Sequence, residues 1–587
     1  MATPISVQNF RAIVETKEVD GRLNTEYQTL PHGAVHPHEE GKKEFNVPKN
    51  RFISTFPYDH SRVILTDRQS DPGSDYINAN YIDGVSRPKA YIALQGPKKK
   101  TVEAFWTMIW QQKCHTIVML TNLYENGRNK CHQYWPDVDD PLKLGAFSVH
   151  LNTEKEYAFY VKRVMVLKHR KKNQERLVCQ FHYTKWPDHG IPDVFELVMF
   201  HRHIQRSRIP EDGPLAVHCS AGIGRTGTLI ALDSLLEAGK KNESIDVHGY
   251  VLTMRKDRMN MVQTVDQYRV IHLALIEGFT FPDNIQTKED LISYEEPGIY
   301  VVPANQTQRN KEYQTLQDIN TTSAKRLKYE TAKSADNRAK NRDMEILPAD
   351  NYKAPLFSEM PTGNYINAVK VPGFRNHLKY LVTQFPLRDT IMDFWTLVTD
   401  FSAKTIVCLE EFGSEKEIQW WPEKSMVKYA GTFEVRTVSA DTCTDDINAS
   451  LLNIKDKKND NTHYVKLFQV RNWAKDASIP TSESVLCKLH YLVEAWLMSK
   501  EEGPVVVTCL DGANHSGLYC LISTMLERLD SEADVDMYAT TRQLQIRRPQ
   551  FIATLDQYRY AWTALKAYIQ TTGNDECAEE AVYQNTS

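Results

Sequence analysis

The sequence lacks the features of several common classes of protein. No apolar run approaches the 18 or more residues of a membrane span, and residues 1–4 do not begin a signal peptide. The formal charge of −4 over 587 residues gives no excess of positive charge for nucleic acid or a membrane surface. We therefore expect a soluble chain with no nucleic-acid partner.

Cysteine is present but forms no framework. The 10 cysteines include no Cys-x-x-Cys pair and show no regular spacing. Such usage argues against both a disulfide scaffold and a thiolate metal site, and it suits a reducing compartment. The sequence accordingly predicts no metal and no cofactor.

What the sequence does contain is an internal repeat. A chain of 587 residues is too long for one hydrophobic core. Short motifs recur at offsets between 286 and 291 residues: 26–30 with 312–316, 76–79 with 365–368, 105–106 with 394–395, and 135–136 with 421–422. This period predicts two domains of similar fold.

The most informative stretch is residues 218–227, His-Cys-Ser-Ala-Gly-Ile-Gly-Arg-Thr-Gly. An apolar run at 214–217 precedes it and leucines at helical spacing follow it, so a loop should join a buried strand to a helix. Backbone N–H groups of small residues, together with the helix dipole, would hold an oxyanion there. The residues of this anion nest are Ser220, Ala221, Gly222, Ile223 and Gly224.

The side chains around this nest predict phosphoryl transfer. Cys219 would be a thiolate nucleophile, with His218 beside it in a supporting role. Arg225 would grip two phosphoryl oxygens with its planar fork and bind them more tightly in the transition state. Thr226 would place a hydroxyl beside the sulfur and stabilise it as a leaving group.

Two further segments supply the remaining chemistry. Residues 186–190, Trp-Pro-Asp-His-Gly, offer Asp188 as the general acid that protonates the leaving group and as a contact to the substrate. A phosphocysteine must then be hydrolysed, and Gln263 is our candidate for orienting the water. Gln267 would assist it and contact the substrate.

With these motifs the chain resembles the protein tyrosine phosphatases in their receptor-type arrangement with two tandem domains. Further motifs of that family occur in the family's order at residues 49–52, 75–82, 95–97, 105–106 and 130–136. The resemblance implies an α/β fold of the α+β type, each domain a twisted mixed sheet flanked by helices. It implies hydrolysis of phosphotyrosine in proteins through a phosphocysteine, with Glu125 pairing with Arg225 and Lys130 supporting the acid loop.

One departure concerns Phe52, where family members usually have tyrosine. Phenylalanine keeps the aromatic face that stacks on phosphotyrosine and loses only a hydroxyl. Ser54 replaces the acidic or amide residue often found there, so peptide selectivity is the property in question. The aromatic slot argues against phosphoserine and phosphoinositide substrates.

The second copy has lost most of these roles. Cys219 corresponds to Cys509, Arg225 to His515, Gln263 to Ala553 and Phe52 to Asp343. The acid loop reads Trp-Ala-Lys-Asp at 473–476, one residue longer and with lysine where the acid belongs. Neutral histidine cannot make a bidentate clamp, so we predict a pseudophosphatase that contacts the first domain or recruits substrates. In one interpretation Cys509 is a core residue, and in the other it is a redox sensor.

The predicted organisation follows from these motifs. Its parts are a helical, juxtamembrane-like segment at 1–45, a catalytic domain at 20–282, a linker at 283–305, the degenerate domain at 306–571 and a disordered acidic tail at 572–587. In the family such tandem domains form the cytoplasmic part of a single-pass receptor. The chain is expected to be that part or a variant without the membrane segment, with homodimer contacts through its N-terminal segment.

Partners are predicted from three features. Tyr583, with Asn585 two positions on, resembles the ligand of an adaptor SH2 domain, although an inert tail fits equally well. Residues 128–131 and 245–251 are similar to the leukocyte common antigen subfamily, which implies Src-family kinases among the phosphotyrosine substrates. The alternative to an enzyme is a non-catalytic phosphotyrosine-binding scaffold, against which the intact first site argues.

Overall fold

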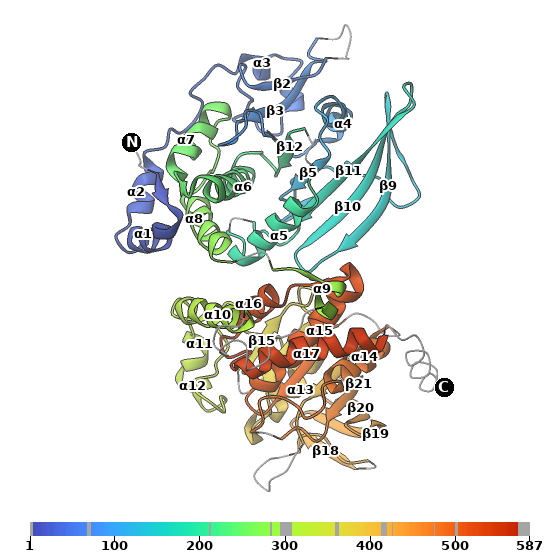
Figure 1. Cartoon of the computed structure of the whole chain (residues 1–587). Coiled ribbons are helices and arrows are strands. Elements are labelled where there is room, and N and C mark those ends of the chain that lie inside the picture. The colour runs from blue at the N-terminus through green and yellow to red at the C-terminus, as the bar shows by residue number, and fades with distance from the viewer. Residues whose placement is uncertain are drawn as a thin grey trace. The chain divides into compact units, whose positions relative to one another are not determined.

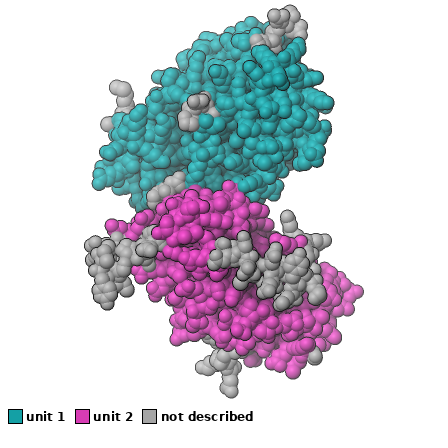
Figure 2. All heavy atoms as spheres, turned by 45° about the vertical axis from the view of Figure 1, so that its right-hand side comes forward, with its two compact units in different colours: residues 1–282 teal, residues 283–587 magenta. Residues whose placement is uncertain are grey.

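The computed structural model describes residues 4–66, 72–188, 190–209, 213–281, 284–293, 308–358, 363–411, 419–424, 426–474, 476–498 and 503–572. Contacts divide the chain into two compact units, residues 1–282 and residues 283–587 (Figure 2). Each unit has one large mixed sheet flanked by helices, as Figure 1 shows, which confirms the α+β class implied by the resemblance. In the described part of the chain, no helix combines the length and apolarity needed to cross a bilayer.

The large sheet of the first unit has, among its described residues, nine strands in the order β2-β3-β4-β12-β5-β11-β10-β9-β8. Its centre is parallel, because β12 pairs in parallel with β4 and β5, and β5 with β11. The strands are β2 (Arg62–Ile64), β3 (Tyr76–Ile82), β4 (Tyr91–Leu94), β5 (Thr116–Met119), β8 (Leu142–Leu144), β9 (Phe147–Glu156), β10 (Tyr160–His169), β11 (Gln174–Tyr183) and β12 (Leu215–His218). A small hairpin, β6 (Tyr124–Glu125) and β7 (Arg128–Asn129), lies outside this sheet. Parallel central strands bring their carboxyl ends to one edge, where a ligand site is expected.

Helices cover both faces of this sheet. On one face Phe105 and Trp106 of α4 (Val102–Gln111) join a buried core with residues of the central strands. The other layer contains α6 (Gly224–Asn242), which contacts β4, β12, α7 (Val247–Asp257) and α8 (Val265–Thr280), while α5 (Val194–Arg206) packs on α8. Short turns of 3-10 helix are η1 (Val47–Lys49) and η2 (Lys99–Thr101).

The N-terminal segment packs on its own unit. Its elements are β1 (Ile5–Ser6), α1 (Val7–Val19), α2 (Arg22–Gln28) and α3 (Glu39–Lys42). β1 pairs with β13 (Ser244–Ile245), and the buried ring of Phe10 stacks on His272. Buried apolar residues of these helices therefore face the first unit, and the homodimer remains a prediction.

The second unit repeats the plan. Its large sheet, as far as the residues are described, has eight strands in the order β15-β16-β22-β17-β21-β20-β19-β18. The strands are β15 (Ala368–Val371), β16 (Tyr380–Gln384), β17 (Thr405–Cys408), β18 (Val427–Ala430), β19 (Phe433–Thr444), β20 (Ile447–Asp456), β21 (Asn461–Val470) and β22 (Val505–Cys509). The helices are α10 (Gln308–Ala324), α11 (Glu330–Lys333), α12 (Ala335–Arg338), η4 (Arg388–Thr390), α13 (Ile391–Asp400), α14 (Val485–Leu497), α15 (Asn514–Glu532), α16 (Met537–Arg547) and α17 (Leu555–Thr572).

Part of the predicted linker at 283–305 belongs to the second unit. β14 (Gln286–Thr287) pairs with β23 (Asp534–Val535), and α9 (Lys288–Ser293) contacts α17. Residues 283 and 294–305 of the linker and residues 573–587 of the predicted tail, including Tyr583, lie outside the described residues.

Candidate active site

Cys219 lies in the loop between a strand and a helix. β12 ends at His218 and α6 begins at Gly224, as the sequence predicted. Gly222 has a φ of +73°, and a Cβ there would lie 2.2 Å from the carbonyl oxygen of Leu94, so glycine is required. The Gly222 N–H donates to the Cys219 sulfur at 3.3 Å. The loop and the first turn of α6 thus form an anion nest beside the sulfur.

Arg225 is held at this nest by a buried carboxylate. Its Nη1 donates to Oε1 of Glu125 at 2.7 Å, and its Nη2 donates to Oε2 at 2.9 Å. Glu125 also accepts from the Thr121 hydroxyl at 3.0 Å and the Asn122 N–H at 3.1 Å. This fork-to-fork pair, with a further bond from Nη1 to the Leu120 carbonyl at 3.0 Å, fixes the plane and position of the guanidinium before a ligand arrives.

The loop that contains Asp188, residues 186–190, lies next to the Arg225 guanidinium. Asp188 accepts at 3.0 Å from Lys130 Nζ and at 3.0 Å from the side-chain amide of Asn126. Its Oδ1 lies 3.7 Å from Nη2 of Arg225, which also donates to the Pro187 carbonyl at 3.3 Å. The structure therefore brings Asp188, Lys130 and Arg225 together, and adds Asn126, which the sequence reasoning missed.

Gln263 and Gln267, which lie just before and within α8, are close in space to the start of α6. Gln267 accepts the backbone N–H of Gln263 at 2.8 Å, and a Cβ on Gly224 would lie 2.9 Å from the Gln267 amide. The adjacent Thr226 hydroxyl is buried and has no hydrogen-bond partner among the described residues. Both glutamines are thus positioned beside the nest, and within the described part of the chain the Thr226 hydroxyl makes no hydrogen bond to the sulfur.

Phe52 is presented at the surface by a tightly held loop. Its side chain is 41% exposed, and the adjacent Ile53 is 83% exposed. Arg51 donates to the Pro97 carbonyl at 2.8 Å, and Lys98 donates to the carbonyls of Pro48 and Asn50, both at 2.8 Å. The aromatic face is therefore available for stacking on a ligand.

His218 contacts the backbone of Cys219. Its Nδ1 lies 3.2 Å from the Cys219 carbonyl oxygen, and its Nε2 lies 2.8 Å from the Tyr134 hydroxyl. Burial lowers the pKa of His218 to about 4, so the ring is neutral at pH 7. A neutral ring that donates from Nδ1 and accepts at Nε2 satisfies both contacts.

A second residue that sequence reasoning missed is Arg258, which follows α7. Its Nε donates to the Gly222 carbonyl at 2.8 Å and its Nη2 to the Ala221 carbonyl at 3.1 Å. Its other bonds go to Asn80 at 2.7 Å and Asn78 at 2.8 Å. Burial lowers the pKa of Arg258 to about 10, which leaves it charged at neutral pH. By binding the loop carbonyls, Arg258 leaves the loop N–H groups to face the nest.

Replacing Arg258 by lysine is expected to destabilise the first unit by about 1–3 kcal/mol, because one ammonium cannot satisfy all four acceptors. Chemical denaturation of the whole chain measures this loss. Arg128→Lys, at an exposed position, is the matched control. Equal stability of the two variants would contradict the role assigned to Arg258.

The Protein-tyrosine phosphatase family model matches residues 46–277 and, a second time, residues 337–567. The chain belongs to the protein-tyrosine phosphatases. It is 33% identical to receptor-type tyrosine-protein phosphatase F of Danio rerio over 574 residues, which cover 96% of this chain and 30% of the relative. The Homo sapiens phosphatase F is 33% identical over 575 residues, covering 96% and 30%. Receptor-type tyrosine-protein phosphatase S of Gallus gallus is 33% identical over 555 residues, covering 93% and 36%. The chain thus spans about a third of the length of these curated relatives.

In the second phosphatase domain, the protein's own carboxylates occupy the corresponding nest. Asp511 Oδ1 accepts from the Ala513 N–H at 2.8 Å and the Asn514 N–H at 3.0 Å. Glu410 accepts from the Leu510 N–H at 3.1 Å. Backbone donors that would bind a phosphate are therefore engaged already, by groups that would also repel it.

His515 takes the place of the arginine but is fully enclosed. Its Nδ1 lies 3.1 Å from Oε1 of Glu410, its Nε2 lies 2.9 Å from the Ala477 carbonyl oxygen, and its side chain is 1% exposed. The Trp473 ring stacks on it at 3.9 Å between centroids. Gln557, the counterpart of Gln267, donates to the Asn514 carbonyl at 3.0 Å. The ring is thus enclosed by groups of the protein itself and is not presented to a ligand.

The acid loop of the second phosphatase domain is longer than the one extra residue predicted. Trp186 lies eight positions before the start of α5, whereas Trp473 lies twelve positions before the start of α14. Asp476 is exposed, and Lys475 lies outside the described residues. The motif at 473–476 did not reveal this difference, because the additional residues come after it in the sequence.

Cys509 is in a poor environment for a thiolate. Burial, and then the charges of Asp511 and Glu410, raise its pKa well above the usual range of cysteine. The Ser516 hydroxyl donates to the sulfur at 3.0 Å and offsets this only in part. Cys509 is therefore a thiol at neutral pH, which favours the core residue over the redox sensor.

Proposed function

We propose that the first domain hydrolyses phosphotyrosine in proteins through a phosphocysteine intermediate on Cys219. The observation that carries this proposal is the convergence of three groups on one nest: the Cys219 sulfur, the Arg225 guanidinium fixed by Glu125, and the Asp188 carboxyl 3.7 Å from that guanidinium. A nucleophile, an anion clamp and an acid are what phosphoryl transfer to sulfur requires.

The proposed reaction has two displacements at phosphorus. In the first, the thiolate forms the P–S bond, the P–O bond to tyrosine breaks, and Asp188 gives its proton to the departing phenolate oxygen. In the second, water positioned by Gln263 loses a proton to Asp188 and attacks phosphorus, and the P–S bond breaks to return the thiolate. Thr226 would stabilise the thiolate as it leaves. Arg225 binds the equatorial oxygens in both steps.

Substrate selection is proposed to depend on Phe52. Its exposed ring, on a loop fixed by Arg51 and Lys98, would stack on the phenyl ring of phosphotyrosine. Shorter phosphoserine side chains would not reach the nest past that ring.

We further propose that the second domain is catalytically inactive and that it regulates the first domain or recruits substrates. Support comes from the nest occupied by Asp511 and Glu410 and from the enclosed His515. Because the relatives are receptor-type phosphatases, we also propose that both domains belong to the intracellular part of a membrane receptor.

The experiment that tests this function measures phosphate release from a phosphotyrosine peptide by the whole chain, in EDTA with a thiol reductant. We expect turnover of the phosphotyrosine peptide and at most a few per cent of that rate with the matched phosphoserine peptide. A chain that binds the phosphotyrosine peptide without turnover would replace the enzyme by the scaffold alternative.

A further inference from the structure

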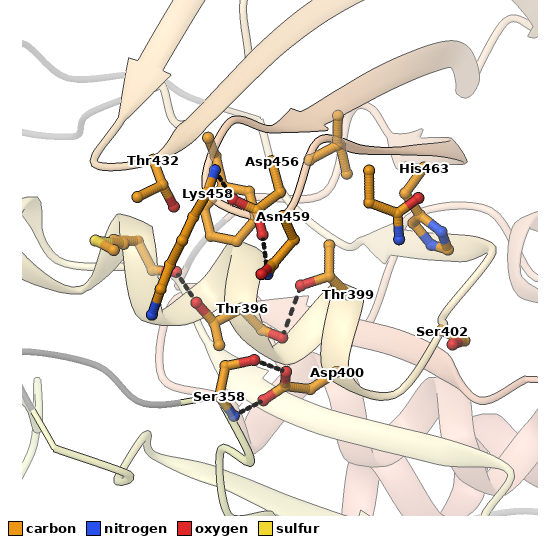
Figure 3. A pocket seen from close by; sticks show the side chains of 14 residues that line it. Ser358, Thr396, Thr399, Asp400, Ser402, Thr432, Asp456, Lys458, Asn459 and His463 are labelled. Carbon is orange, nitrogen blue, oxygen red and sulfur yellow. Dashed lines mark hydrogen bonds between the residues drawn. The ribbon is translucent and has the colours of Figure 1, made fainter.

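A second site candidate lies in the second unit, away from the Cys509 loop. A cavity of about 690 Å³ is lined by α13, by Ser358 and Ser402, and by β19, β20 and β21 with their connections (Figure 3). Phe433, Ile454 and Met392 form its apolar part, and hydroxyl, amide, carboxylate, ammonium and imidazole groups line the remainder. Its volume is in the range of small-ligand sites.

In the first unit, side chains fill the corresponding place. Trp110 of α4 packs on Phe147 and His169, with ring centroids 5.6 Å and 5.5 Å away. The Arg176 guanidinium lies over the Trp110 ring at 4.5 Å and donates to the Trp110 carbonyl at 2.9 Å. An aromatic ring covered by a cation therefore closes this edge of the first domain.

Strand register and helix length identify the residues of the second domain that correspond to Trp110, His169 and Arg176. His169 is opposite Phe147 in the first sheet, and Asp456 is opposite Phe433 in the second. Arg176 is opposite Leu167, and His463 is opposite Ile454. The helices α4 and α13 both have ten residues, which places Thr399 at the position of Trp110.

Smaller side chains replace Trp110 and Arg176, and the positive charge of Arg176 is lost while Asp456 adds a negative one. The Thr399 hydroxyl donates to the Trp395 carbonyl of its own helix at 3.0 Å, and His463 Nε2 lies 2.7 Å from the Ala403 carbonyl oxygen. Neither side chain refills the space of the lost indole and guanidinium. Asp456 lies at the position of His169, whose ring contacts the Trp110 indole in the first domain, so the second domain has a carboxylate at that position.

The charged groups of the lining favour a cation. Asp400 and Asp456 contribute two carboxylates, whereas Lys458 contributes one ammonium (Figure 3). Burial lowers the pKa of His463 and keeps that ring neutral at pH 7. Both carboxylates accept local hydrogen bonds: Asp400 from the Phe357 N–H and from the N–H and hydroxyl of Ser358, and Asp456 from the Lys458 N–H and the Asn459 side-chain amide. Since a carboxylate has about four acceptor sites, each retains capacity for a ligand.

We propose that this cavity is a binding site for an aromatic ring that carries, or lies next to, a positive charge. Such a ligand reproduces the ring and cation that Trp110 and Arg176 provide in the first domain. The ring lies beside Phe433 at the place of the indole, and the cation approaches Asp456. Two sources share this chemistry: a free aromatic amine, and neighbouring tryptophan and arginine side chains of a partner peptide. The site is independent of the reaction proposed for Cys219.

The test uses the whole chain and ligand-observed NMR titrations. Tryptamine, indole-3-propionate and the peptide acetyl-Arg-Trp-amide are titrated separately. We expect saturable binding of tryptamine with a Kd of about 1 mM or below, at least about ten-fold tighter than the anionic indole-3-propionate. A peptide that binds more tightly than tryptamine identifies the partner side chains as the source, and the reverse order identifies a free amine.

Three variants locate the binding. Thr399→Trp restores the residue of the first domain and is expected to abolish tryptamine binding. Asp456→Asn is expected to remove the preference for the cation and leave the fold intact, as thermal melting would show. Asp441→Asn, at an exposed position on β19 outside the cavity, is the matched control and should bind like the unaltered chain.

The proposal is overturned if tryptamine shows no saturable binding, if indole-3-propionate binds equally well, or if Thr399→Trp binds tryptamine unchanged. Each of these results would mean that the cavity is an unfilled packing difference between the two domains.

Discussion

Replacing Cys219 by serine is expected to lower kcat for a phosphotyrosine peptide by at least about 10³-fold. A serine hydroxyl at this position is not ionised at neutral pH, and it lacks the reactivity of a thiolate sulfur. The nest, Arg225 and its partner Glu125 are unchanged by the substitution, so the peptide should still bind. Phosphate release under single-turnover and steady-state conditions measures the loss, and peptide binding by calorimetry measures what remains.

Cys509→Ser is the matched control for this variant, because it makes the same exchange at the equivalent position of the second domain. Its kcat should equal that of the unaltered chain, since Cys509 is a buried thiol whose nest is occupied by Asp511. Activity that survives in Cys219→Ser and disappears in the double variant would assign catalysis to the second domain and contradict our account.

Replacing Asp188 by asparagine is expected to lower kcat for a phosphotyrosine peptide by about 10²–10⁴-fold. Asparagine can accept the Lys130 contact at its amide oxygen, and its NH2 can donate to the Asn126 amide oxygen once that amide has turned over, but it has no proton to give to the tyrosine oxygen. A substrate whose leaving group needs little protonation, such as p-nitrophenyl phosphate, should therefore lose much less activity. The ratio of the two losses separates proton donation from a change in loop position.

Asp139→Asn is the control for Asp188→Asn. It removes the same charge at an exposed position of the same domain and should leave both substrates unaffected. Equal losses for the peptide and for p-nitrophenyl phosphate in Asp188→Asn would refute the general-acid role.

Local sequence predicted the strand, loop and helix around Cys219 because these features depend on residues that are adjacent in the chain. Small residues between an apolar run and a helical pattern permit little else. The two-domain arrangement was equally accessible, since the repeat extends over most of the chain.

Contacts between distant segments were not accessible in this way. Arg258 binds the loop at Gly222 from 36 positions away, and Glu410 reaches Leu510 from 100 positions away. Nothing in the local pattern of either residue distinguishes it from an ordinary surface charge. The repeat offered one missed signal. Arg258 corresponds to an arginine in the second copy, Arg548, which donates to the Gly512 carbonyl at 2.6 Å, whereas Arg225 corresponds to a histidine. A buried arginine kept in both copies indicates support of the loop, not catalysis.

The carboxylates in the second nest bear on whether its lost chemistry could be regained. A change of His515 to arginine alone would meet Glu410 and Asp511 already bound to the loop, and it would find neither an acid nor a water-orienting glutamine in place. Each single substitution toward an active site would thus bring no benefit until several others were present. If the second domain is inactive as proposed, its loss of hydrolysis would be hard to reverse in evolution, because no single substitution would restore the site.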